Sequence, residues 1–205
     1  MLADLAINEY LARTASGDPL PGGGSAAALN AALAAALIEM VANLTIGRKK
    51  FEGVEAEMRA LALTAAELRA AAVQAIDRDA EAYTQVLAAF KLPKGTDGEK
   101  ARRGRAVDEA FKHAALVPLS VARKAAALMA LGRTVIVKGN PNACSDAAAG
   151  VLAARTAVRA AVFNVRINHA AIRDAAFAAE LAEEAGRLEA EAESQEKEIL
   201  ALVTL

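Results

Sequence analysis

Apolar residues recur with the 3.6-residue period of a helix along almost the whole chain, and no segment alternates apolar and polar residues as a strand does. Clusters of Gly and Pro at residues 16–24 and 91–96 separate the periodic segments. The pattern predicts an all-α, single-domain bundle of about six helices over residues 1–205. The expected helices cover residues 3–15, 25–46, 54–90, about 97 onward, 145–168, and 171 to the C-terminus.

Two places within the fourth helix leave alternatives open. Pro118 should kink or divide this helix, because proline removes a backbone hydrogen bond and clashes with the preceding turn. Thr134–Val137 is the only β-branched run. It fits a short extended piece as well as a frayed helix end.

Small residues on two helices predict a close contact. Residues 25–46 present Ala28, Ala32 and Ala36 on one face, and residues 145–168 present Gly150 and Ala157 on another. Small side chains allow close helix approach, so we expect these helices to pack together. Residues 54–90 would extend about 55 Å as one helix. Helices of such length overhang a monomeric bundle, and we therefore expect a homodimer.

Composition and charge limit the possible partners and compartment. The formal net charge of −1 and the 3% of aromatic residues argue against nucleic acid and an anionic membrane as partners. Glu39 lies inside the most apolar helix, which favours burial in a bundle over membrane insertion. The N-terminus has an early acid and no basic segment typical of a secretory signal. A single cysteine, Cys144, indicates a reducing compartment, so we expect a cytoplasmic protein.

Two polar turns precede long apolar helices. Pro21–Ser25 places three glycines directly before a helix, where free N–H groups favour an anion or a polar ligand atom. It lacks the Gly-Lys-Ser/Thr ending of a phosphate-binding P-loop. Gly139–Asp146 forms the second turn. Together they suggest a ligand site, which we expect the two turns to enclose.

Asp79 is the candidate acid–base residue. It falls on the apolar stripe of residues 54–90, whereas Asp77 and Glu81 are predicted on the opposite face. Desolvation would raise the pKa of a carboxyl group there toward neutrality, as acid–base catalysis requires. A purely structural Asp bonded to a neighbouring Tyr, Arg or helix end remains the alternative. For Asp146, a first-turn acid that complements the helix dipole is the simpler explanation.

An ordered set of motifs covers nearly the whole chain and resembles the formimidoyltetrahydrofolate cyclodeaminase / methenyltetrahydrofolate cyclohydrolase family. The motifs are Pro21–Ser25, Asn43–Lys50, Ala75–Tyr83, Leu92–Lys94, Gly139–Asn142, Ser145–Ala147 and Asn164–Asn168. The resemblance implies an all-helical homodimer that acts on a tetrahydrofolate derivative. It implies no metal and no further cofactor.

The resemblance also implies roles for particular residues. Asp79 would be catalytic, and Asp146 would be a second acid or the partner of the pterin amino group. The expected substrate-binding residues are Gly23, Gly24, Ser25, Thr45, Arg48, Lys94, Asn140, Asn142 and Ser145. Because no formiminotransferase half is visible, hydrolysis of 5,10-methenyltetrahydrofolate is favoured over the cyclodeaminase reaction. The cyclodeaminase and a non-catalytic folate-binding dimer stay as alternatives.

Overall fold

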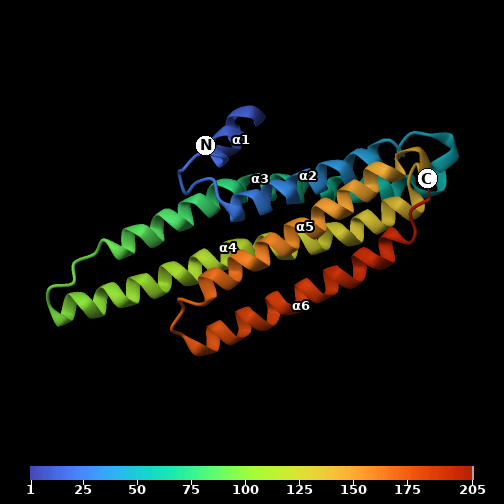
Figure 1. The fold of residues 1–205 in the computed structure, drawn as a ribbon. Helices are drawn as coiled ribbons and strands as arrows, with labels where there is room; N and C mark the ends of the chain where they lie inside the picture. Colours follow the sequence, from blue (N-terminus) through green and yellow to red (C-terminus); the bar gives the residue numbers. More distant parts are fainter. Residues whose placement is uncertain (205) are drawn as a thin grey trace.

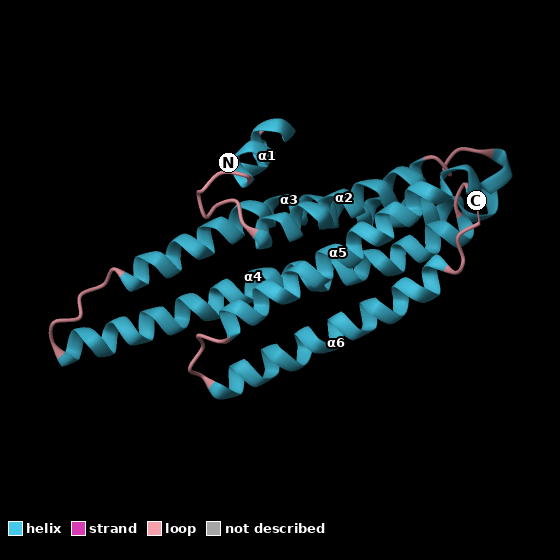
Figure 2. Ribbon diagram, viewed as in Figure 1, coloured by secondary structure: helices cyan, strands magenta, loops and turns pink. Residues whose placement is uncertain are grey.

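Residues 1–204, which the computed structural model describes, form six α-helices and three short 3-10 helices without strands (Figure 2). The all-α prediction is confirmed. The α-helices are α1 (Ile7–Thr14), α2 (Gly23–Asn43), α3 (Glu55–Phe90), α4 (Asp97–Lys138), α5 (Cys144–His169) and α6 (Ala175–Leu200). The 3-10 helices are η1 (Leu2–Asp4), η2 (Lys49–Val54) and η3 (Pro141–Ala143).

The largest differences from the predicted elements lie at the N-terminus and in α4. The expected helix over residues 3–15 is divided into η1 and α1. α4 continues through Pro118 as one element of 42 residues, so the proline does not divide it. Thr134–Val137 belongs to the last turns of α4, where the Val135 carbonyl accepts a hydrogen bond from the Gly139 N–H. Of the two alternatives for that run, the helix end is therefore the one observed.

α2 packs against α3, α4 and α5 (Figure 1). Most of its buried residues are alanine, which lets neighbouring helices approach closely. Gly150 of α5 illustrates the fit: a Cβ there would lie 3.2 Å from the Ile38 side chain and 3.4 Å from the Ala34 carbonyl oxygen of α2. The predicted contact between these two helices is confirmed.

The two polar turns lie at opposite ends of α2. Gly23 at its start meets Asn164 near the end of α5, whereas Thr45, just beyond its end, meets the turn before α5. There the Thr45 hydroxyl oxygen accepts a hydrogen bond from the Asn140 N–H at 2.9 Å. α2 and α5 are thus antiparallel, and one chain does not bring both turns to the same pocket. The expectation that they enclose one site is wrong for a single chain.

Three helical segments are long and apolar enough to cross a membrane by length and composition alone: Gly23–Asn43, Asp97–Lys138 and Pro141–His169. About half of each most apolar stretch is buried inside the bundle, with 56% for the first segment. About half of the apolar character of these helices is therefore used for packing inside the bundle.

Candidate active site

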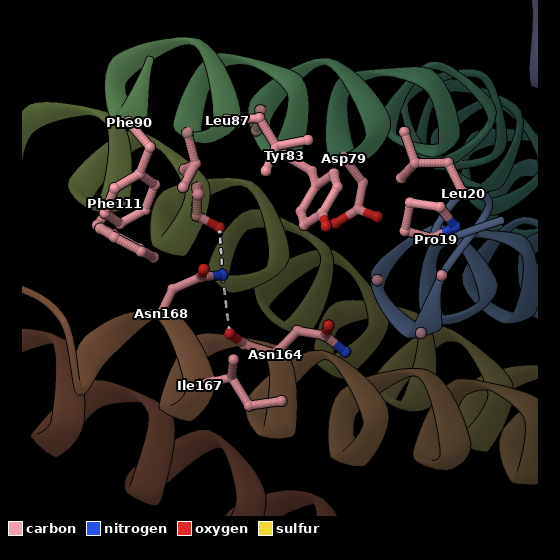
Figure 3. A pocket seen from close by; sticks show the side chains of 16 residues that line it. Pro19, Leu20, Asp79, Tyr83, Leu87, Phe90, Phe111, Asn164, Ile167 and Asn168 are labelled. Carbon is pink, nitrogen blue, oxygen red and sulfur yellow. Dashed lines mark hydrogen bonds between the residues drawn. The ribbon is translucent and has the colours of Figure 1, made fainter. Parts of the chain in front are cut away.

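A pocket of about 420 Å³ lies between the start of α2 and the facing sides of α3, α4 and α5 (Figure 3). Its volume falls in the range of small-molecule sites. One end is polar and contains the glycine turn, Asp79 and Asn164, and the other end is apolar. The lining residues are Pro19, Leu20, Gly22, Gly23, Gly24, Asp79, Ala82, Tyr83, Val86, Leu87, Phe90, Phe111, Ala114, Asn164, Ile167 and Asn168.

Asp79 projects from α3 toward the first turn of α2. Its Oδ2 accepts a hydrogen bond of 3.0 Å from the Ser25 hydroxyl, which also lies 2.9 Å from the Ile76 carbonyl oxygen. A Cβ at Gly24 would overlap the Asp79 carboxylate, so only glycine permits this approach. The carboxylate therefore sits at the positive end of the α2 dipole, where a negative charge is stabilised.

Burial raises the pKa of Asp79 above its ordinary value of 3.8, and the hydrogen bonds from the side chain and backbone of Ser25 oppose that rise only in part. Desolvation destabilises the charged form, which accounts for the direction. The result is a carboxyl group that binds a proton more readily than an exposed Asp. Such a group suits proton transfer nearer neutral pH.

Tyr10 of α1 is a buried neighbour of this carboxylate. It packs beside Leu29 of α2 and Ile76 of α3, one turn along each helix from Ser25 and Asp79. Burial, followed by the negative charge of Asp79, raises the pKa of the Tyr10 phenol. Within residues 1–204 the hydroxyl has no hydrogen-bond partner. Residue spacing along α3 gave no indication that α1 would cover this side of Asp79.

The prediction that Asp77 faces solvent is wrong. Asp77 is buried, and its carboxylate accepts hydrogen bonds from the backbone N–H groups of Leu2 at 2.6 Å and Ala3 at 3.3 Å. The N-terminal segment folds back over this face of α3 and covers it. Glu81, on the same predicted face, is exposed as expected.

The apolar end of the pocket offers aromatic surfaces. The rings of Phe90 and Phe111 meet edge to face, with centroids 6.0 Å apart and an interplanar angle of 78°. Tyr83 and Leu87 continue this wall along α3 toward Asp79 (Figure 3). Tyr83, Leu87 and Phe90 are each about 40% exposed, so a ligand here would cover apolar surface that is open in the single chain. A flat, partly polar ring fits such a wall.

The predicted site residues divide into two groups. Gly23, Gly24 and Asp79 line the pocket, and buried Ser25 bonds to Asp79 behind it. Apart from Lys94, the other predicted residues lie at the far end of α2. At that end Thr45 and Asn140 are both buried. The Asn140 side chain is hydrogen-bonded within the protein, because its Nδ2 donates to the Leu44 carbonyl oxygen at 3.3 Å.

The remaining predicted residues also lie outside the pocket. Asn142, Ser145 and Arg48 are exposed and Asp146 is half-buried in the first turn of α5. Lys94 is exposed in the α3–α4 connection, four residues after pocket-lining Phe90. Among residues 1–204, no three His, Cys, Asp or Glu side chains gather as a metal-ligand set.

Asn164 and Asn168 line the pocket from α5, although they are not among the predicted binding residues. Their spacing of four residues places both side chains on one helix face. That spacing was a usable signal. Tyr83 also lines the pocket and is not among the predicted binding residues.

Comparisons with known proteins find relatives that match nearly the whole chain. Residues 6–187 match the family model described as formiminotransferase-cyclodeaminase. The chain is 42% identical over 192 residues to methenyltetrahydrofolate cyclohydrolase of Methylorubrum extorquens, covering 94% of this chain and 92% of that enzyme. It is 36% identical to formimidoyltransferase-cyclodeaminase of Sus scrofa, covering 92% of this chain but 35% of that longer protein.

The fold has a solved counterpart. The crystal structure of formiminotetrahydrofolate cyclodeaminase from Thermotoga maritima superimposes with a TM-score of 0.89 at 29% sequence identity, covering 99% of this chain and 98% of that one. Family model, relatives and fold therefore agree over nearly the full length. The chain belongs to the formiminotransferase-cyclodeaminase family of cyclohydrolase and cyclodeaminase enzymes.

Proposed function

We propose that this protein hydrolyses 5,10-methenyltetrahydrofolate to 10-formyltetrahydrofolate. The observation that carries the proposal is the half-buried Asp79 carboxylate, which faces a ligand-sized pocket at the start of α2. The 42%-identical relative, matched over 92% of its length, is a methenyltetrahydrofolate cyclohydrolase. We place the reaction in the cytoplasm, without a membrane or nucleic-acid partner.

In this proposal, Asp79 moves protons at the one-carbon bridge. Water attacks the amidinium carbon between N5 and N10, and the Asp79 carboxylate takes a proton from it. The bond from carbon to N5 then breaks while protonated Asp79 returns a proton to N5. The remaining hydroxyl proton passes to solvent as the formyl C=O on N10 forms. The negative charge of Asp79 also stabilises the cationic bridge before attack.

Ser25 suits both protonation states of Asp79. When Asp79 is ionised, the Ser25 hydroxyl donates to Oδ2. When Asp79 is protonated, the same hydroxyl can turn to the Ile76 carbonyl, which lies 2.9 Å away, and accept the new proton. The carboxyl group therefore keeps a hydrogen-bond partner throughout the proton transfer.

The cyclodeaminase reaction is the second candidate, because the matched Thermotoga maritima structure is a formiminotetrahydrofolate cyclodeaminase. There N10 attacks the formimino carbon, ammonia leaves, and the methenyl bridge forms. The same carboxyl group would protonate the departing nitrogen. A folate-binding protein without turnover is the alternative of another class.

The absorbance of 5,10-methenyltetrahydrofolate separates these candidates. Decay of the absorbance with enzyme supports hydrolysis, whereas its appearance from formimidoyltetrahydrofolate with ammonia release supports deamination. Tight binding with neither change would indicate the non-catalytic protein. Asp79→Asn is expected to abolish turnover, and Glu81→Gln, an exposed acid two residues along α3, serves as the control. Normal turnover by folded Asp79→Asn would refute the assignment.

We further propose a homodimer that joins the two groups of predicted residues. The outer face of α2 carries an exposed apolar stripe: Leu29, Leu33, Met40 and Leu44. A two-fold axis across the middle of α2 would pair this stripe with itself. The end of α2 of one chain would then lie over the pocket of the other. The pocket lining contains no Lys or Arg, so Arg48 of the partner subunit could meet the carboxylate tail of the substrate.

A complementation experiment tests the shared site. Asp79→Asn and Arg48→Ala homodimers are each expected to have little activity. In a mixed dimer, one of the two sites would carry both wild-type residues, so unfolding and refolding the two variants together should restore activity. A monomer at assay concentration, or mixtures no more active than the separate variants, would refute the shared site.

A further inference from the structure

Asn168 has a carboxamide whose orientation the structure fixes. Its Nδ2 donates to the Ala114 carbonyl of α4 at 3.0 Å and to the Asn164 carbonyl of α5 at 3.0 Å (Figure 3). Both amide hydrogens are therefore used. Turning the group by 180° would place Oδ1 against two carbonyl oxygens, which have no hydrogen to donate. Oδ1 must consequently remain the free end of the carboxamide.

Asn164 presents a second acceptor one helical turn away. Its Nδ2 donates to the Ala160 carbonyl at 2.9 Å. Its carboxamide lies against the start of α2, where a Cβ at Gly23 would be 3.3 Å from Nδ2 and 3.8 Å from Oδ1. Among residues 1–204, no side-chain hydrogen bond ends on the Oδ1 of Asn164 or Asn168.

The polar side chains of the pocket are mostly acceptors. Asp79, Asn164 and Asn168 contribute oxygens, and Tyr83 supplies the one side-chain hydroxyl of the lining. Asn164 lies beside Gly23, adjacent to the Gly24–Asp79 contact, and Asn168 is about 6 Å further along α5. The acceptors thus extend from the Asp79 end of the pocket along its α5 wall. A ligand that satisfies these acceptors must carry N–H donors, and the distance from its reacting atoms to those donors must match the distance from Asp79 to the two Asn side chains.

We propose that Asn168, assisted by Asn164, recognises the amino-pyrimidinone edge of the reduced pterin ring. This proposal rests on the proposed function and specifies how the substrate lies in the pocket. The one-carbon bridge is next to Asp79, and the exocyclic amino group and the neighbouring ring N–H donate to the Asn168 and Asn164 Oδ1 atoms. A ring without that amino group leaves an acceptor unpaired, which is the strongest basis for rejecting a close analogue.

The test compares 5,10-methenyltetrahydrofolate with its 2-desamino-2-methyl analogue. We expect the wild-type kcat/KM to be about 100-fold lower for the analogue, the loss expected from one buried acceptor left unpaired. Asn168→Leu, similar in size but without polar atoms, should reduce this ratio by about tenfold or more. Because both substrates are measured with the same preparation, the ratio is independent of the folded fraction. A merely structural bond between α4 and α5 would leave it unchanged.

Asn30→Leu is the matched control, because Asn30 also donates to a carbonyl one turn back, that of Ala26 at 2.9 Å, but does not line the pocket. Its ratio should equal that of the wild type. An Asn168→Leu ratio equal to that of the wild type would overturn the proposal. If the wild type turns over neither compound, the proposed function fails. The same ratio is then measured from dissociation constants of tetrahydrofolate and its desamino analogue by calorimetry, with the same two outcomes.

Discussion

Gly24→Ala is a one-carbon change that should disconnect Asp79 from Ser25. A Cβ at this position would overlap all three atoms of the Asp79 carboxyl group. The backbone itself can accept alanine, because Gly47 is the one glycine with a positive φ among residues 1–204. The carboxylate must therefore move toward the open pocket, away from the first turn of α2.

The size of the effect follows from the bonds that are lost. A hydrogen bond to an ionised group contributes about 1.5–3 kcal/mol. If the loss falls on the transition state, kcat/KM decreases about 10- to 150-fold, at 1.36 kcal/mol per tenfold. Loss of the Ser25 hydrogen bonds by itself would raise the pKa of Asp79, but the desolvation that a more hydrated carboxylate loses is the larger influence and acts in the opposite direction. The acidic limb of the kcat/KM profile should consequently move to lower pH.

The assay is the decay of 5,10-methenyltetrahydrofolate absorbance across a pH series. Gly98→Ala is the matched control, since Gly98 is also the second residue of a helix, α4, and a Cβ there meets nothing within 4 Å. The free energy of unfolding of Gly98→Ala should lie within about 1 kcal/mol of the wild type, because Ala favours a helix by about that amount over Gly. That of Gly24→Ala should fall by no more than the lost hydrogen bond contributes, about 1.5–3 kcal/mol. Wild-type kcat/KM and an unmoved pH profile for Gly24→Ala would refute the assigned role of the Asp79–Ser25 contact.

Four further predictions concern the same region. Ser25→Ala removes a bond that lowers the pKa of Asp79, so the acidic limb should move to higher pH; a shift to lower pH would contradict this account. The pKa of Asp79 is higher in the folded protein than its ordinary value of 3.8. The free energy of unfolding therefore falls as the pH rises from 3.8 through the folded-state pKa, because ionised Asp79 is less stable in the folded state than in the unfolded state. Asp79→Asn should therefore be at least as stable as the wild type in urea at pH 7, with no such advantage below 3.8. Asp77→Ala should lower the free energy of unfolding by about 2 kcal/mol and speed hydrogen exchange of the Leu2 and Ala3 amides. Wild-type stability and exchange rates would contradict this role of Asp77. Tyr10→Phe removes a buried hydroxyl that has no hydrogen-bond partner in residues 1–204, so the free energy of unfolding should be unchanged or higher by up to about 1 kcal/mol. A decrease in the free energy of unfolding would show that the hydroxyl is hydrogen-bonded.

Hydrophobic periodicity was sufficient to predict the six α-helices and the face of α3 that holds Asp79. It works because each helix buries one continuous stripe, and a carboxylate within that stripe stands out. The close packing of α2 on α5 was equally visible, since Gly150 and the facing alanines leave room only for a near approach. These features depend on contacts that repeat along one helix.

Hydrophobic periodicity did not predict features that depend on how the chain runs from one helix to the next. The angle of Asp77 on α3 pointed away from the apolar stripe, but residues 2 and 3 return to cover it with their amides. Likewise, two polar turns before apolar helices looked alike in sequence. Their positions at opposite ends of α2 follow from the antiparallel course of α5, which helix periodicity does not encode.

The environment of Asp79 combines influences that oppose one another. The N-terminus of α2 and the Ser25 hydroxyl favour the charged carboxylate, whereas burial favours the protonated form and prevails. Either influence alone would give a poorer acid–base group: a fully solvated Asp is too weak a base to take up a proton near neutral pH, and an isolated buried one holds its proton too tightly. Gly24 sets this balance, because the missing side chain allows the carboxylate to reach the helix end while staying out of bulk water.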